Sequence, residues 1–136
     1  MEARTRETIR ECARLSFAGE ITFPEVVRRL AAEGVERYHA DLVGRETSYY
    51  DATERVEKKA LPLEGAPAIA ERFSEEGVRQ ALAAVQGREI GYPDFLRRIM
   101  AAGTVAYTVF FKGRHVLYAG RDGGFHVERF PGAPPH

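Results

Sequence analysis

The residues best suited to chemistry in this sequence stand at alternate positions in one stretch. Arg37, His39 and Asp41 alternate with apolar residues, and Ser48 and Tyr50 continue the alternation beyond a glycine-containing turn. In a β-hairpin these five side chains would share one face of the sheet. A histidine beside a carboxylate or hydroxyl can act as a general acid or base, and an arginine can hold an anion. The pattern therefore predicts a candidate ligand face.

The same alternation has a purely structural interpretation, because polar and apolar residues alternate in any strand with one buried face. Two hypotheses follow. In the first, the chain is a small non-enzymatic binding or interaction protein that uses its exposed sheet face. In the second, it is a small enzyme that acts on an anionic small molecule through His39, Asp41 and Arg37. The sequence does not identify a catalytic residue, a ligand or a partner.

Other chemistry is poorly supported by the sequence. It contains no phosphate-binding loop, dinucleotide fingerprint or nucleophile elbow. None of the four histidines has metal-ligand spacing to another, so we expect no metal, and we expect no cofactor. The single cysteine, Cys12, lies among apolar helical neighbours and is interpreted as a small core residue.

Charge and hydropathy limit the range of partners. Twenty basic and twenty acidic residues cancel, so the whole molecule has no net attraction for nucleic acid or anionic lipid. The pairs Arg28-Arg29 and Arg97-Arg98 are interpreted as solvated helix faces, and nucleic-acid binding is not expected. No apolar run is long enough to span a bilayer and no targeting segment is recognised, so we expect a cytoplasmic protein.

The elements that must position these residues occur twice. Residues 20–51 align without a gap on residues 89–120, with eleven identical residues in thirty-two positions, which makes a chance match improbable. The sequence thus predicts one domain over residues 1–136 with an internal repeat of residues 5–61 and 74–130. Residues 131–136 are expected to form a tail.

Each copy is expected to contain two helices and three strands. The first helices are predicted at residues 5–18 and 75–86, with Ser74 as a cap, and the second helices should be about eleven residues long. Thr22 and Glu25 suggest a capping box at the start of a second helix. Gly34 and Gly103 suit left-handed helix ends.

The strands follow these glycines. The matched tyrosines of the two copies are expected on the buried face of the strands, primarily as core residues, with a stacking platform for a ligand as the lesser alternative: Tyr38, Tyr49, Tyr107 and Tyr118. Gly44 and Gly113, each followed by arginine, predict type II′ hairpin turns with glycine at the first central position. Third strands are expected at residues 55–61 and 125–130. The fold class is therefore α+β, an internally duplicated helix-helix-hairpin-strand unit whose antiparallel sheet of about six strands has helices packed on one face.

A family resemblance accompanies this pattern. The segment Ile90-Gly91-Tyr92-Pro93-Asp94-Phe95-Leu96-Arg97-Arg98-Ile99-Met100-Ala101-Ala102-Gly103, followed by an aromatic hairpin that ends in Tyr118, resembles the YdfO-like family of small bacterial and prophage proteins. This is a domain-of-unknown-function group whose members are sometimes labelled phage envelope protein. The resemblance implies a phage-related protein of this fold, without an activity, a cofactor or site residues.

The two copies differ on the strand face that carries the candidate ligand residues. The second copy is largely apolar there and has Ala106, Thr108, Phe110, Leu117 and Ala119. An apolar face that no helix covers favours self-association. A homodimer through a patch containing Phe110 and Leu117 is therefore expected.

Overall fold

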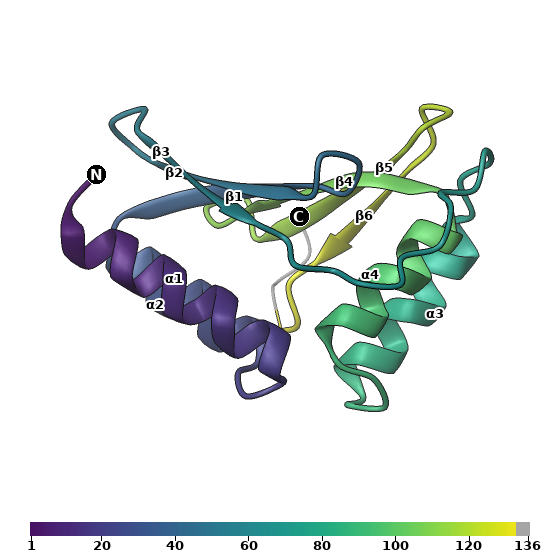
Figure 1. Cartoon of the computed structure of the whole chain (residues 1–136), viewed down its shortest axis with the longest axis horizontal. Helices are drawn as coiled ribbons and strands as arrows, with labels where there is room; N and C mark the ends of the chain where they lie inside the picture. Colours follow the sequence, from purple (N-terminus) through teal and green to yellow (C-terminus); the bar gives the residue numbers. More distant parts are fainter. Residues whose placement is uncertain (133–136) are drawn as a thin grey trace.

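The computed structural model describes residues 1–132, which form four helices and one sheet of six antiparallel strands. The α+β fold predicted from the sequence is confirmed (Figure 1). The elements in chain order are α1 (Ala3–Ala18), α2 (Phe23–Ala32), β1 (Val35–Asp41), β2 (Glu46–Asp51), β3 (Val56–Ala60), α3 (Glu75–Gln86), α4 (Tyr92–Ala101), β4 (Thr104–Phe110), β5 (His115–Gly120) and β6 (Phe125–Arg129). Residues 133–136 of the expected tail lie outside the described part.

The strand order is β3-β2-β1-β4-β5-β6, so β1 and β4 join the two halves of the chain at the middle of the sheet. In this antiparallel pair His39 lies opposite Thr108, with Arg37 opposite Phe110 at one end. His39 and Thr108 are also equivalent positions in the 69-residue alignment of the two copies. The pairing is therefore symmetric about them, as two copies of one unit would require, while the duplication itself stays a prediction.

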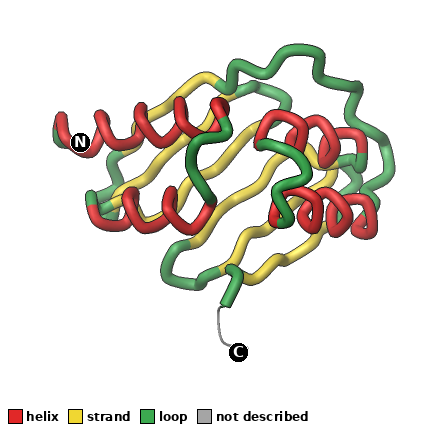
Figure 2. The backbone as a smooth tube through the Cα atoms, turned by 90° about the horizontal axis from the view of Figure 1, so that it is seen from below, coloured by secondary structure: helices red, strands yellow, loops and turns green. Residues whose placement is uncertain are grey.

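All four helices cover one face of the sheet, α1 and α2 under the first half and α3 and α4 under the second (Figure 2). The core lies between the two layers, where Ile9, Leu30, Leu96 and Ile99 are fully buried. Within each helix the buried residues recur three or four positions apart, as Ile9 and Cys12 do in α1, which is typical of an amphipathic helix packed on a sheet. Within residues 1–132, no helix combines the length and the apolar character needed to cross a membrane.

The helix caps agree only in part with the expectation. Ser74 caps α3 as predicted, since its hydroxyl accepts a 3.0 Å hydrogen bond from the amide of Gly77. The capping box at α2 is wrong, because the Thr22 side chain makes no cap hydrogen bond. Instead, the carboxylate of Glu25 forms ion pairs with Arg28 and Arg29 on the next turn of α2, and the distance to Arg29 is 3.0 Å. These two bonds lower the pKa of Glu25 to about 2.

The hairpin turns also differ from the expected type II′ geometry. Each loop has four residues, and its left-handed residue is Arg45 (φ 58°) or Arg114 (φ 57°), not the preceding glycine. In the first loop the carboxylate of Asp41 accepts hydrogen bonds from the amides of Val43 and Gly44. A Cβ at Gly44 would lie 2.7 Å from that carboxylate. Glycine is therefore favoured here because it leaves space for the Asp41 side chain, and not because the backbone has a left-handed φ.

The segment between the two halves packs against the end of α4 at Gly103, whose equivalent in the first half is Gly34. Gly34 and Gly103 both have left-handed φ values, +88° and +96°. A Cβ at Gly34 would meet nothing within 4 Å, whereas one at Gly103 would lie 2.5 Å from the carbonyl oxygen of Arg72. The same fold position is therefore open in one half and closed in the other.

These glycines predict unequal costs for the same substitution. Gly34→Ala should lower the free energy of unfolding by about 1 kcal/mol, the cost of a left-handed alanine. Gly103→Ala should lower it by about 3 kcal/mol or more, because the methyl group must also displace backbone at Arg72. Urea denaturation measures both, and equal losses would contradict the packing described here.

Thr104 provides a second stability test. It is fully buried, and its hydroxyl has no hydrogen-bond partner in the described chain. The equivalent residue in the first half is Val35, 3% exposed. Thr104→Val should raise the unfolding free energy by about 1 kcal/mol because it removes an unsatisfied buried hydroxyl of the same shape. The reciprocal control, Val35→Thr, should lower it, and a destabilised Thr104→Val protein would show that the hydroxyl is satisfied.

Candidate ligand-binding cleft

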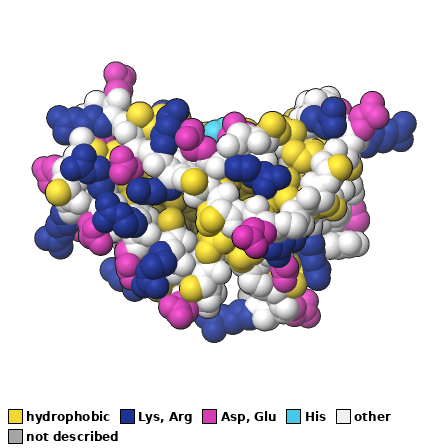
Figure 3. Space-filling model, in the orientation of Figure 1, with side chains coloured by type: hydrophobic (Ala, Val, Ile, Leu, Met, Phe, Trp, Pro, Cys, Tyr) yellow, Lys and Arg dark blue, Asp and Glu magenta, His cyan; other side chains and the backbone are white. Residues whose placement is uncertain are grey.

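A cleft separates the two helix pairs on the covered side of the sheet. Its cavity has a volume of about 1520 Å³. The strands of the sheet form its floor, and α1, α2, the end of α3, the start of α4 and the loops that precede α2 and α4 form its walls. Hydrophobic side chains are visible in the hollow between the helix pairs (Figure 3). The cleft lies where the two helix pairs, each packed on its own half of the sheet, diverge from one another (Figure 1).

Four tyrosines form a row across the floor. Tyr49, Tyr38, Tyr107 and Tyr118 come from four adjacent strands, and successive ring centroids lie 5.3, 6.4 and 5.5 Å apart. Each is between 4% and 7% exposed, so the prediction that they lie on the buried face is confirmed. Burial raises the pKa of all four phenols. The row is therefore neutral at physiological pH, with hydroxyls that can donate or accept.

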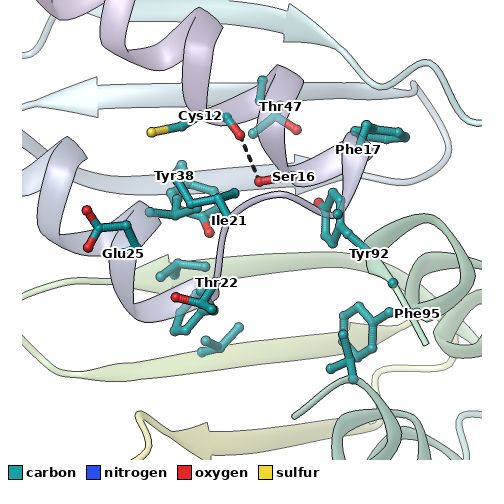
Figure 4. A pocket seen from close by; sticks show the side chains of 18 of the residues that line it. Cys12, Ser16, Phe17, Ile21, Thr22, Glu25, Tyr38, Thr47, Tyr92 and Phe95 are labelled. Atoms are coloured by element: carbon teal, nitrogen blue, oxygen red, sulfur yellow. Dashed lines mark hydrogen bonds between the residues drawn. The ribbon is translucent and has the colours of Figure 1, made fainter. Parts of the chain in front are cut away.

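Tyr92, at the start of α4, connects the two walls to the floor. Its hydroxyl is hydrogen-bonded to that of Tyr107. Its ring lies beside Phe17 of α1 (Figure 4) and packs edge-on against it, with the ring centroids 5.3 Å apart. Burial raises the pKa of Tyr92 to about 12. The equivalent residue in the first half is Phe23, which has no hydroxyl and packs against Phe130. Tyr38 consequently lacks the partner that Tyr107 has.

Several hydroxyls on the cleft surface are left without partners. Those of Tyr38, Tyr49, Tyr118 and Thr47 make no hydrogen bond to any residue of the described chain. These hydroxyls are not fully enclosed either. In residues 1–132, the polar side-chain atoms that are both fully enclosed and without a partner belong to two other residues, Thr104 and Arg129. The hydroxyls of the three tyrosines and Thr47 therefore reach the cleft surface without a partner in the described chain.

The two halves of the cleft differ in chemistry although their backbones correspond. Ser16, Thr22 and Thr47 line the first half, and at the equivalent positions the second half has Val85, Gly91 and Val116. Among the described lining residues, the first half contributes four cationic and two anionic side chains, and the second two cationic and three anionic. We call the first half the hydroxyl end, defined by Ser16, Thr22, Tyr38, Thr47, Tyr49 and Lys59.

Cys12 also lines the cleft, from α1. It is 2% exposed, in agreement with its interpretation as a core residue. Burial raises the pKa of its thiol, so the neutral form predominates at physiological pH. Within residues 1–132, no group of three or more potential metal ligands is clustered.

The candidate ligand face predicted from the sequence lies on the opposite, helix-free side of the sheet. His39 is hydrogen-bonded to Thr108 (Nδ1 to Oγ1, 2.7 Å), whereas Asp41 binds the turn backbone. Arg37 pairs with Glu36 and lies 4.3 Å above the ring centroid of Tyr50. The structure thus brings Arg37 to Tyr50 and His39 to Thr108, but does not bond His39 to Asp41.

Ser48 completes that face, opposite His39 in the β1–β2 register and 9% exposed. None of the five predicted residues lines the cleft. Their role in ligand binding or catalysis stays a prediction. From the sequence, the cleft tyrosines were expected primarily in the core, with a stacking platform for a ligand as the lesser alternative. A comparison of equivalent positions on the helix-facing side, such as Thr47 with Val116, could have found the hydroxyl end.

The predicted self-association patch is also on the helix-free side. Phe110 and Leu117 are partly exposed there, and β6 adds the exposed side chains of Phe125 and Val127. No helix of the described chain covers them (Figure 1). The apolar patch is therefore open, and the homodimer stays a prediction.

Comparison with known proteins relates part of the chain to a protein family. Residues 1–57 match the model of a family described as a protein of unknown function, DUF1398. The match extends from α1 to the start of β3, whereas the YdfO-like resemblance came from residues 90–118. No curated protein matches the chain. The first half is therefore similar to an uncharacterised family, and the YdfO-like name and the phage association stay predictions.

Proposed function

We propose that the protein binds a small organic molecule in the cleft between its two helix pairs. The observation that carries this proposal is the set of unpaired hydroxyls on an aromatic floor, at Tyr38, Tyr49, Tyr118 and Thr47. Apolar concave sites with a few convergent polar groups are typical of ligand pockets. The rings offer flat apolar contact area, and the hydroxyls fix the orientation of the ligand.

The cleft supports binding more than catalysis. No histidine of the described chain lines it, and the thiol of Cys12 and the phenols of the tyrosine row all have raised pKa values. Raised pKa values keep these groups protonated, which suits hydrogen bonding and not nucleophilic attack. The proposal keeps the non-enzymatic binding role expected from the sequence and moves the site to the opposite face of the sheet.

The proposal predicts saturable binding of a small aromatic probe. 8-Anilinonaphthalene-1-sulfonate should bind the native protein with one site per chain, measured by its fluorescence increase. Ala13→Trp places an indole in the cavity from α1 and should weaken binding by about tenfold or more. Phe125→Ser, which removes a 62% exposed ring on the opposite face, should leave binding unchanged.

Melting curves must accompany these titrations, because the probe also binds partly unfolded protein. Both variants should melt cooperatively. The proposal is wrong if Phe125→Ser abolishes binding while Ala13→Trp does not, since the probe would then report the apolar patch on the helix-free face.

A further inference from the structure

We infer that the ligand of the cleft is an amphipathic carboxylate that binds with its anionic group at the hydroxyl end, beside Lys59, and its apolar body toward the second half. This inference rests on the proposed function and adds the chemical class and the orientation of the ligand.

An unpaired lysine in the cleft, Lys59, carries this inference. It lies on β3 opposite Thr47, lines the cleft and is only partly exposed. It makes no ion pair with any residue from 1 to 132, whereas its neighbour Lys58 pairs with Glu46 at 3.5 Å. A cation that is partly withdrawn from water beside apolar surface gains most from an anion that binds there.

The other cations of the first half are already paired. Arg10 is held by Glu7, Arg14 by Glu11 at 2.6 Å, and Arg29 by Glu25 at 3.0 Å. Lys59 is therefore the cation of this half, among the described lining residues, whose charge is not compensated within the chain. One uncompensated lysine matches a monoanion such as a carboxylate.

Hydroxyl donors lie next to Lys59 in the strand register. Thr47 is directly opposite it, Tyr49 is the next residue of β2 on the same face, and Tyr38 is opposite Tyr49. None of these three hydroxyls has a partner within the described residues. A carboxylate has two oxygens with about four acceptor sites, so it can accept from the lysine and from hydroxyls around it.

The second half of the cleft has the opposite character. At the position equivalent to Lys59 stands Glu128, which is hydrogen-bonded by His126 at 3.0 Å. The floor beside it is more apolar, with Val116 in place of Thr47 and Phe95 packed edge-on against Tyr118, although Arg88 and Arg129 also line this half. An acidic group at one end and apolar surface next to it would repel a second anion and accept a hydrocarbon or aromatic body.

The test compares two probes that have the same ring and differ in charge, one with a carboxylate and one with a neutral carboxamide. Naphthalene-2-carboxylate and naphthalene-2-carboxamide have the same ring and size, and isothermal titration measures both. The carboxylate should bind the wild-type protein about tenfold more tightly, as expected for hydrogen bonds to a charged group. Lys59→Met should remove that difference, while Lys58→Met, on the other face of the same strand, should retain it.

Thr47→Val provides a second variant with little risk to folding, because valine occupies the equivalent position 116. It should weaken carboxylate binding severalfold and leave carboxamide binding nearly unchanged. Equal affinities of the two probes, unaffected by Lys59→Met, would overturn the carboxylate inference and leave the cleft as a binding site. Failure of both probes, together with failure of the fluorescent probe, would overturn the proposed function itself.

Discussion

The hydrogen-bonded pairing of β1 with β4 is the contact on which the rest of the structure depends. It joins two helix-helix-strand-strand-strand halves into a single sheet, with His39 opposite Thr108 at its centre. Each helix pair packs on its own half, and the cleft lies where the two pairs diverge from one another (Figure 1). The cleft is therefore a consequence of the topology, and its floor is made of the residues that the strands direct toward the helices.

The backbone of the two halves corresponds, but their side chains make the two ends of the cleft different. Tyr92 bonds to Tyr107, but Phe23 at the equivalent position cannot do the same for Tyr38. The first half has the unpaired hydroxyls of Tyr38, Tyr49 and Thr47 and an uncompensated lysine, whereas the second has one unpaired hydroxyl, at Tyr118, and Glu128 beside more apolar surface. A backbone with matching halves thus supports a site with two unlike ends, which is the property that an amphipathic ligand requires.

Much of the fold could be predicted because it follows from local rules. Helical periodicity and the Ser74 cap placed α3 at residues 75–86, as observed, and strand alternation predicted six strands. The turn at Gly44 was predicted wrongly because the local glycine rule takes no account of the Asp41 carboxylate, which folds the loop. The joining of both halves through β1 and β4 could not be predicted, because it is a tertiary contact without a local signal. Whether a buried tyrosine has a hydroxyl partner also depends on tertiary contacts, so the cleft was not foreseen.

The most direct measurement of the central claim is a crystal structure of the protein with naphthalene-2-carboxylate. The ring is expected over Tyr38 and Tyr107 in the cleft, with the carboxylate within hydrogen-bond distance of Lys59 and Thr47. Density for the probe on the helix-free face, around Phe125 and Val127, with an empty cleft would contradict this expectation.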